Sequence, residues 1–294
     1  MQMTPEQIES ERRTGRIAGI IGIAGIILFV GIGAAGFAPE FRAADGFAES
    51  LAVFGDEKSE VMILLIFQAV AIVMFIPALV TLFNVVRARS ESLRPGLIGL
   101  CFAGPLFFAG SLVASYFAID AAAGVFDPSM VEAGADIDEE ARDVYLDQSS
   151  ASVASGLEFA GRLGLTFVMI YLSLNAMRSG VMTRFWGTLG MALGVGVILL
   201  GPPALLAFFL AISLMVARLW PGGLPPAWDA GRAIPWPKPG EQVAATPTES
   251  RGDEPASADD FETLEGTATE VDTEPERPGR RDNKRKRKRK ARGS

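Results

Sequence analysis

The sequence contains no histidine among its 294 residues and only one cysteine, Cys101. The absence of histidine excludes metal sites built on imidazole ligands and every catalytic triad that needs a histidine base. A single cysteine excludes a disulfide within the chain, so cysteine usage does not indicate the redox compartment. No nucleophile–base pair, metal-ligand cluster or phosphate-binding loop stands out. The sequence therefore predicts a protein that is not an enzyme and needs no cofactor.

Charged residues are also scarce. They make up 21% of the chain, against roughly 25% in an ordinary soluble protein, and 49% of the residues are hydrophobic. The charges are unevenly placed, and five long apolar blocks contain almost none. Because a helix needs about 20 mostly apolar residues to cross a bilayer, these blocks predict membrane-spanning helices. The composition excludes a soluble globular domain.

The last apolar block, residues 185–217, would be about 50 Å long as one helix, which is more than a bilayer requires. Pro202 and Pro203 lie in its middle and remove two backbone donors, so we expect two short spans joined by a tight turn. The predicted fold is an all-α membrane protein with six transmembrane helices in a membrane domain over 17–219. The predicted spans are 17–37, 61–86, 97–119, 157–177, 185–200 and 204–219.

The positions of Lys and Arg predict the orientation, because cytoplasmic loops carry the excess of basic residues. Basic residues precede the first span and lie between spans two and three and between spans four and five. The loops on the opposite side, 38–60 and 120–156, carry three basic and fifteen acidic residues. We therefore expect a multi-pass protein of the cytoplasmic membrane with residues 1–16 and the C-terminus in the cytoplasm. A first span of 21 residues is longer than the core of a cleaved signal peptide, so we expect it to be kept.

The four tryptophans are Trp186, Trp220, Trp228 and Trp236. All lie at or just beyond predicted cytoplasmic ends of spans, where amphipathic rings prefer the membrane interface. Three of them belong to the proline-rich segment 220–240, which cannot form a regular helix throughout. We expect this segment to lie along the membrane surface as an extended strap with the tryptophans as interfacial anchors.

Residues 241–294 contain almost nothing apolar and predict a disordered tail. Residues 241–276 carry twelve acids, whereas residues 277–292 carry eleven basic residues and one acid. The basic block predicts contact with anionic lipid headgroups. It contains no aromatic residues for base stacking, so specific nucleic-acid binding is not expected. Its densest run is Lys284, Arg285, Lys286, Arg287, Lys288, Arg289 and Lys290.

Four segments carry a resemblance: residues 174–190 (LNAMRSGVMTRFWGTLG), 201–203 (GPP), 220–228 (WPGGLPPAW) and 231–236 (GRAIPW). They are similar to parts of a group of actinobacterial multi-pass integral membrane proteins. The similarity covers approximately residues 10–240 and leaves the tail outside. It implies a membrane location and a topology of the kind given above. Because no activity is known for the group, the resemblance implies no mechanism.

Glu158 and Arg162 fall inside the predicted span 157–177, and charges within a membrane are candidates for a functional site. Their i,i+4 spacing, with the acid first, allows a direct ion pair on one helix face. Ser155 and Glu158 also match a capping box, which predicts that the helix starts there and that the pair is structural. The alternative is a small transporter or channel that uses Glu158, Arg162 and Gln68 along an internal path.

The acidic loop 120–156 contains Asp136, Asp138 and Glu140 at the spacing of calcium-loop ligands, but Ala141 replaces the glycine that such a loop requires. We expect a short helix there instead, starting after Asp136 as its N-cap residue.

The predicted fifth span carries Gly190 and Gly194 in a GxxxG spacing, which lets helix backbones approach closely. We expect this motif to pack helices within the chain, with dimerisation as the alternative. The predicted partners are therefore the lipid bilayer and, through such a motif, a second copy of the chain.

Overall fold

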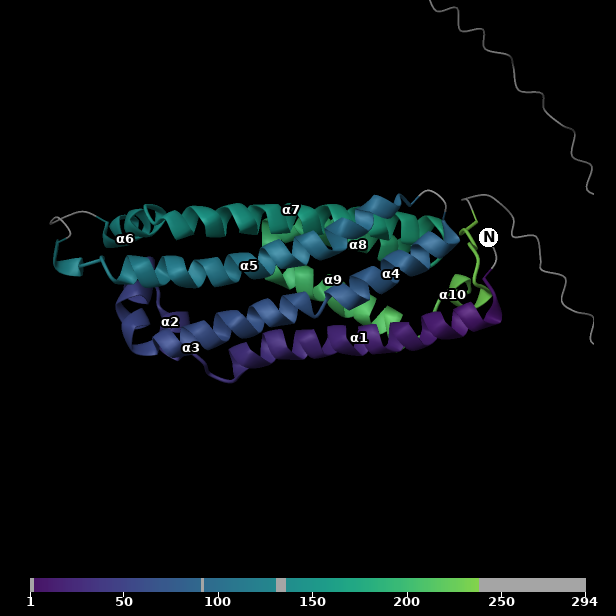
Figure 1. Ribbon diagram of the computed structural model, residues 1–294, viewed down its shortest axis with the longest axis horizontal. Coiled ribbons are helices and arrows are strands. Elements are labelled where there is room, and N and C mark those ends of the chain that lie inside the picture. Colours follow the sequence, from purple (N-terminus) through teal and green to yellow (C-terminus); the bar gives the residue numbers. More distant parts are fainter. Residues whose placement is uncertain (1–2, 91–92, 131–135, 238–294) are drawn as a thin grey trace, which may run out of the picture. The chain divides into compact units, whose positions relative to one another are not determined.

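A computed structural model describes residues 3–90, 93–130 and 136–237, and every regular element in this part of the chain is helical (Figure 1). The described residues belong to one compact unit, Met1–Gln242, while the predicted disordered tail, with its basic run, lies outside them. The all-helical fold class is confirmed. The α-helices are α1 (Pro5–Ala34), α2 (Pro39–Ala43), α3 (Phe47–Val73), α4 (Ile76–Arg89), α5 (Ile98–Ala123), α6 (Ile137–Leu146), α7 (Ser149–Arg178), α8 (Arg184–Leu200), α9 (Pro202–Val216) and α10 (Ala227–Ala230), and the 3₁₀ helices are η1 (Pro95–Leu97) and η2 (Pro128–Met130).

Four stretches of helix are long and apolar enough to cross a membrane by length and composition. They are α1, the stretch Phe47–Arg89 that holds α3 and α4, the stretch Pro95–Ala123 that holds η1 and α5, and α7. The helices α8 and α9 are apolar but shorter. These helices are compatible with insertion into a membrane.

The N-terminal helix begins earlier than the predicted first span. It starts at Pro5 because Thr4 and Gln7 form a capping box. The backbone N–H of Gln7 donates to the Thr4 hydroxyl oxygen at 3.3 Å, and the backbone N–H of Thr4 donates to the Gln7 side-chain oxygen at 2.9 Å. The polar residues before position 17 therefore extend the same helix beyond the apolar run.

The predicted single helix over 61–86 is divided in the structure. Helix α3 ends at Val73 and α4 begins at Ile76, with Pro77 in its first turn. Proline lacks a backbone N–H and its ring clashes with the carbonyl four residues earlier, which favours a kink or a break in the helix just before it. The break changes the direction of the chain at this point (Figure 1).

The predicted division of the last apolar block is confirmed. Helix α8 ends at Leu200 and α9 begins at Pro202, and Gly201 between them has φ 64°. A left-handed conformation of this kind favours glycine, because it has no Cβ. Pro202 and Pro203 occupy the first turn of α9, where the donors they lack would have no partner within the helix.

Helix α5 lies between α7 on one side and α3 on the other (Figure 1). Helix α1 packs against α3, α4 and α9, and α8 connects α7 with α9. The contact between α5 and α7 depends on glycine: a Cβ on Gly161 would lie 2.6 Å from the backbone nitrogen of Phe108. The GxxxG motif also packs within the chain, with Gly190 against Ser173 and Gly194 against Met169 of α7.

The elements that flank the apolar helices gather at two ends. The start of α1, the ends of α4 and α7, and α10 lie at one end, on the right of Figure 1. The helices α2 and α6 lie at the other end, next to the start of α3. We call the first the basic end and the second the acidic end, after the loops assigned to them in the sequence.

The predicted short helix in the acidic loop is confirmed as α6. The Asp136 carboxylate accepts from the backbone N–H groups of Asp138, at 3.0 Å, and Glu139, at 3.4 Å. Ala141 is buried in a small cluster with residues of α3 and α5. The Asp138 carboxylate in turn accepts from the backbone N–H of Ala48 at 2.8 Å, so it caps the start of α3 from another helix.

Candidate functional site

The charges predicted inside a span do meet. Glu158 and Arg162 form a direct ion pair one turn apart on α7, with 42% and 33% of their side chains exposed. The predicted capping box is wrong, because α7 begins at Ser149 and Ser155 lies well inside it. In this earlier part of the helix, the small side chains of Ala151 and Ala154 are buried. The pair therefore lies on the flank of a longer helix.

The polar residues named for an internal path are not grouped together. Gln68 belongs to α3, and the Glu158–Arg162 pair belongs to α7. Helix α5 packs between these two helices (Figure 1). This arrangement does not favour a transport path that uses all three residues.

The proline-rich segment folds back onto the helices. Residues 220–237, which we call the end segment, contain the one-turn helix α10 and three glycines with positive φ, in place of the expected extended strap. Trp228 is only 2% exposed, and its ring N–H donates to the carbonyl of Val181 at 2.9 Å. Its predicted role as an interfacial anchor is wrong, because protein encloses its ring.

The other three tryptophans also contact protein at the basic end. The ring N–H of Trp236 donates to the carbonyl of Met182 at 2.8 Å. The rings of Trp186 and Trp220 lie perpendicular, with centroids 4.6 Å apart. All three keep some exposed surface, and their placement at a membrane interface stays a prediction.

A buried arginine holds the end segment in place. The Arg89 guanidinium donates to both carboxylate oxygens of Glu11, at 2.8 and 2.9 Å. It also donates to the backbone carbonyls of Val85 (2.9 Å), Ala227 (2.8 Å) and Trp228 (3.1 Å). Two parallel, charge-assisted hydrogen bonds between a guanidinium group and a carboxylate are the strongest arrangement that an arginine–carboxylate pair can adopt. Arg89 thus joins α1, α4 and the end segment through a single side chain.

A second, more exposed charge cluster surrounds Asp229. Its carboxylate accepts from Arg218 at 2.7 Å and from Arg12 at 3.3 Å. The hydrogen bond from Arg218, helped by the charge of both guanidinium groups, lowers the pKa of Asp229 below its ordinary value. Because the Asp229 side chain is 64% exposed, solvent screens these pairs and each contributes little to stability.

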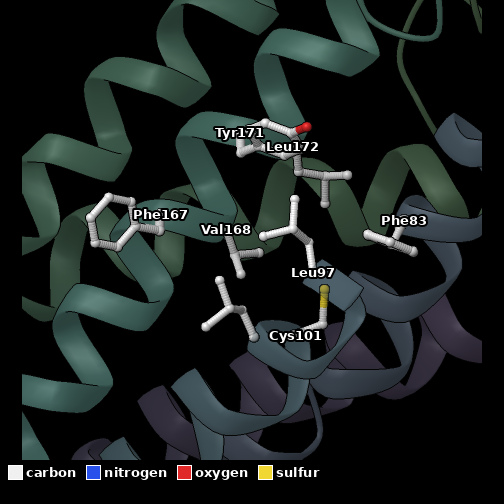
Figure 2. Close-up of a pocket in the computed structure, with 8 residues that line it drawn as sticks. Phe83, Leu97, Cys101, Phe167, Val168, Tyr171 and Leu172 are labelled. Atoms are coloured by element: carbon white, nitrogen blue, oxygen red, sulfur yellow. The ribbon is translucent and has the colours of Figure 1, made fainter. Parts of the chain in front are cut away.

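An apolar pocket lies near the basic end, where α4, the start of α5 and α7 meet (Figure 2). Its volume is about 140 Å³. In Figure 2 the side chains around this space come from three helical elements and the sulfur of Cys101 faces it, whereas the ring of Phe167 lies to one side. Phe167 on α7 is 62% exposed, so the pocket is bordered by the lateral surface of the helices. The lining residues are Phe83, Leu97, Leu100, Cys101, Phe167, Val168, Tyr171 and Leu172.

Sequence reasoning missed both Arg89 and the pocket. In the sequence, Arg89 is one of the basic residues between predicted spans two and three, which indicate a cytoplasmic loop. It continues the helical spacing of Leu82 and Val85, which are buried, and this periodicity was the signal that could have found it. The pocket has no comparable signal, because its residue types are the same as those elsewhere in the spans.

Comparison with protein-family models, with curated proteins and with solved structures finds no match to this chain. Its function is therefore inferred from its own geometry.

Proposed function

We propose that this chain is a six-span integral protein of the cytoplasmic membrane, with both termini in the cytoplasm, that binds lipid and catalyses no reaction. One observation carries the proposal: the apolar helices turn large apolar side chains outward. Leu199 is 78% exposed, and Phe107, Phe167 and Ile27 are exposed as well. An apolar surface of this kind is unfavourable in water, and hydrocarbon tails satisfy it.

The packing of α8 on α7 supports the span formed by α8. The two helices are antiparallel, and Gly194 packs against Met169. Seven residues further along α8 is Gly201, and seven residues back along α7 is Arg162. Because both helices rise about 1.5 Å per residue, the turn at Gly201 lies at about the level of the Glu158–Arg162 pair. A charged pair and the polar backbone of a helix turn are both costly inside the hydrocarbon core, so their common level favours a membrane boundary there.

The packing of α9 on α1 gives the same level independently. Gly22 packs against Ser213. Eleven residues back along α9 is Pro202, and eleven residues forward along α1 is Gly33, next to the end of that helix. The turn between α8 and α9 is therefore about level with the outer end of α1. This agreement favours two full crossings over a shallow hairpin.

Cysteine labelling in intact cells tests the topology. Cys101 is first replaced by alanine, and single cysteines are placed at Glu140, which is exposed on α6, and at Ala245 in the tail. A membrane-impermeant maleimide should label position 140 from outside and label position 245 only after the membrane is opened. External labelling of position 245 would overturn the six-span topology.

The tail supplies a second contact with lipid in this proposal. Its basic block, residues 277–292, faces the anionic cytoplasmic leaflet, where each Lys or Arg contributes about 1 kcal/mol close to the surface. A peptide of residues 270–294 should sediment with vesicles that contain anionic lipid, remain in solution with neutral vesicles, and detach as salt is raised. Binding that ignores lipid charge, or a preference for RNA at physiological salt, would contradict this role.

A further inference from the structure

The apolar pocket of Figure 2 is formed by three helical elements, and each carries an exposed arginine beside it at the basic end. Arg87 follows the part of α4 that contributes Phe83. Arg94 directly precedes η1, and Arg178 ends α7. Among the residues that the structure describes, none of these three arginines forms an ion pair. This distinguishes them from the enclosed Arg89 two residues further along α4.

Two of these arginines lie on the pocket side of their own helices. Arg87 is four residues from Phe83, and Arg178 is seven residues from Tyr171, and both spacings return to the same helix face. At about 1.5 Å per residue, the charges lie about 6 and 10 Å beyond these lining residues along the helix axes. The result is an apolar space with positive charge on one side of it, towards the basic end.

The pocket has the size and chemistry for part of a hydrocarbon chain. Its volume of about 140 Å³ is close to that of an apolar cavity of about 150 Å³ that takes up benzene. The lining is apolar apart from the Tyr171 hydroxyl, so a polar ligand would lose its hydrogen bonds with water there. A ligand for the whole arrangement must therefore be an amphiphile with an apolar chain and an anionic head.

We propose that the pocket holds an acyl chain of an anionic phospholipid from the cytoplasmic leaflet, with its phosphate on Arg87, Arg94 and Arg178. The inference rests on the proposed membrane topology, which puts the basic end in that leaflet. The surrounding bilayer is the source, because the pocket is bordered by the exposed Phe167 on the lateral surface. The head must carry a net negative charge, because three arginines without an acidic partner among the described residues repel the trimethylammonium group of a zwitterionic head. Their guanidinium groups then bind the phosphate oxygens in a bidentate geometry.

Photo-crosslinking in nanodiscs tests this site with the full chain. Phosphatidylglycerol and phosphatidylcholine probes carry the same diazirine-labelled acyl chain and differ only in headgroup. Peptide mapping then compares the pocket peptides, around residues 97–101 and 167–172, with a peptide that holds Leu199, which is exposed away from the pocket lining. We expect the phosphatidylglycerol probe to label the pocket peptides in excess over the phosphatidylcholine probe, and both to label Leu199 equally.

A pair of charge variants isolates the arginines. Arg87→Gln/Arg178→Gln should reduce the headgroup preference at the pocket by roughly tenfold or more. The control is Arg13→Gln/Arg16→Gln, which removes two exposed arginines from the same end, on α1, and should leave the preference unchanged. Both variants keep the tail, so its own attraction for anionic lipid cancels in the comparison. Leu100→Trp, which fills the pocket from its partly exposed wall, should abolish the excess labelling of the pocket peptides by the phosphatidylglycerol probe.

The outcomes separate this site from the proposed function. Labelling of neither the pocket nor Leu199 would mean that the chain is not embedded in lipid, and the topology would fail together with the site. Labelling of Leu199 without an excess at the pocket would overturn the lipid site and leave the topology standing. Equal pocket labelling by both probes, or an equal response to the two double variants, would also overturn it.

Discussion

Replacing Glu11 with glutamine isolates the contribution of the enclosed ion pair at the basic end. The Arg89 side chain is 0% exposed and that of Glu11 is 11% exposed. Glutamine has the shape of glutamate, but it is neutral and turns one acceptor into a donor that faces a guanidinium N–H. Removing one partner of a buried pair costs about 3–5 kcal/mol. Because three backbone carbonyls still accept from Arg89, we expect a loss near the low end, about 3 kcal/mol.

Two measurements on the full chain in detergent check this value. Denaturant titration gives the free energy of unfolding, with Glu9→Gln as the control, since Glu9 is exposed on the same helix and should change stability by less than about 0.5 kcal/mol. The second measurement follows local opening, with a cysteine at the buried Ala227 and Cys101 replaced by alanine. If the loss of about 3 kcal/mol lowers the free energy of local opening at the end segment, the labelling rate at position 227 should rise on the order of a hundredfold.

The reasoning is refuted if Glu11→Gln changes stability no more than Glu9→Gln does. A second comparison tests the carbonyl contacts of the guanidinium. Arg89→Met leaves the carboxylate and the carbonyls without their donor, so it should destabilise the protein more than Glu11→Gln does. Equal losses would mean that the bonds from Arg89 to the end segment contribute nothing.

Three further predictions test other contacts. Gly19→Ala places a Cβ about 2.5 Å from backbone atoms at the end of α9 and should lower the free energy of unfolding by about 1–3 kcal/mol. The control Gly31→Ala meets open space and should raise it by about 0.5 kcal/mol. Equal effects of the two variants would contradict the close approach of α1 and α9. The folded-state pKa of Asp229 is depressed, so the stability it adds is present above its ordinary value of 3.8 and is lost as the pH falls below that value. Thermal melts of the wild type and Asp229→Asn should therefore differ slightly at pH 6 and converge at low pH, and a constant difference would count against the ion pair. Glu158→Gln should lower the free energy of unfolding by about 1 kcal/mol or less, because the ion pair is partly exposed. If the pair is structural, stability should return when Arg162 is also replaced by leucine. A double variant that stays destabilised would contradict a structural role.

The positions of the apolar helices could be predicted because an uninterrupted run of apolar residues has few alternatives to a helix. The break at Gly201 could also be predicted, because proline restricts its own backbone and that of the residue before it. The helix ends could not be predicted: α7 begins at Ser149 without a side-chain cap, and its first turns contain the buried Ala151 and Ala154. Local patterns do not contain that information.

The candidate sites divide in the same way. The Glu158–Arg162 pair lies within one helix, so its spacing was enough to predict it. Arg89 and Arg87 are two residues apart and chemically identical, yet one is enclosed and the other exposed. The helical spacing from Leu82 and Val85 places Arg89 on the buried face, but its bonds to Ala227 and Trp228 depend on the position of the end segment. The tryptophans of that segment indicate a membrane surface by residue type alone, whereas their contacts with Val181 and Met182 depend on the fold.

The contacts of the end segment also impose an order on biogenesis. Arg12 and Asp229, which meet at the basic end, are 217 residues apart in the chain. Synthesis runs from the N-terminus, so α1 and α4 are complete long before residues 227–229 leave the ribosome. Until then Arg89 has no access to the carbonyls of Ala227 and Trp228. Closure of this end is therefore a late event, and a nascent chain that stops short of residue 227 retains an unfinished, charged surface where the finished protein is sealed.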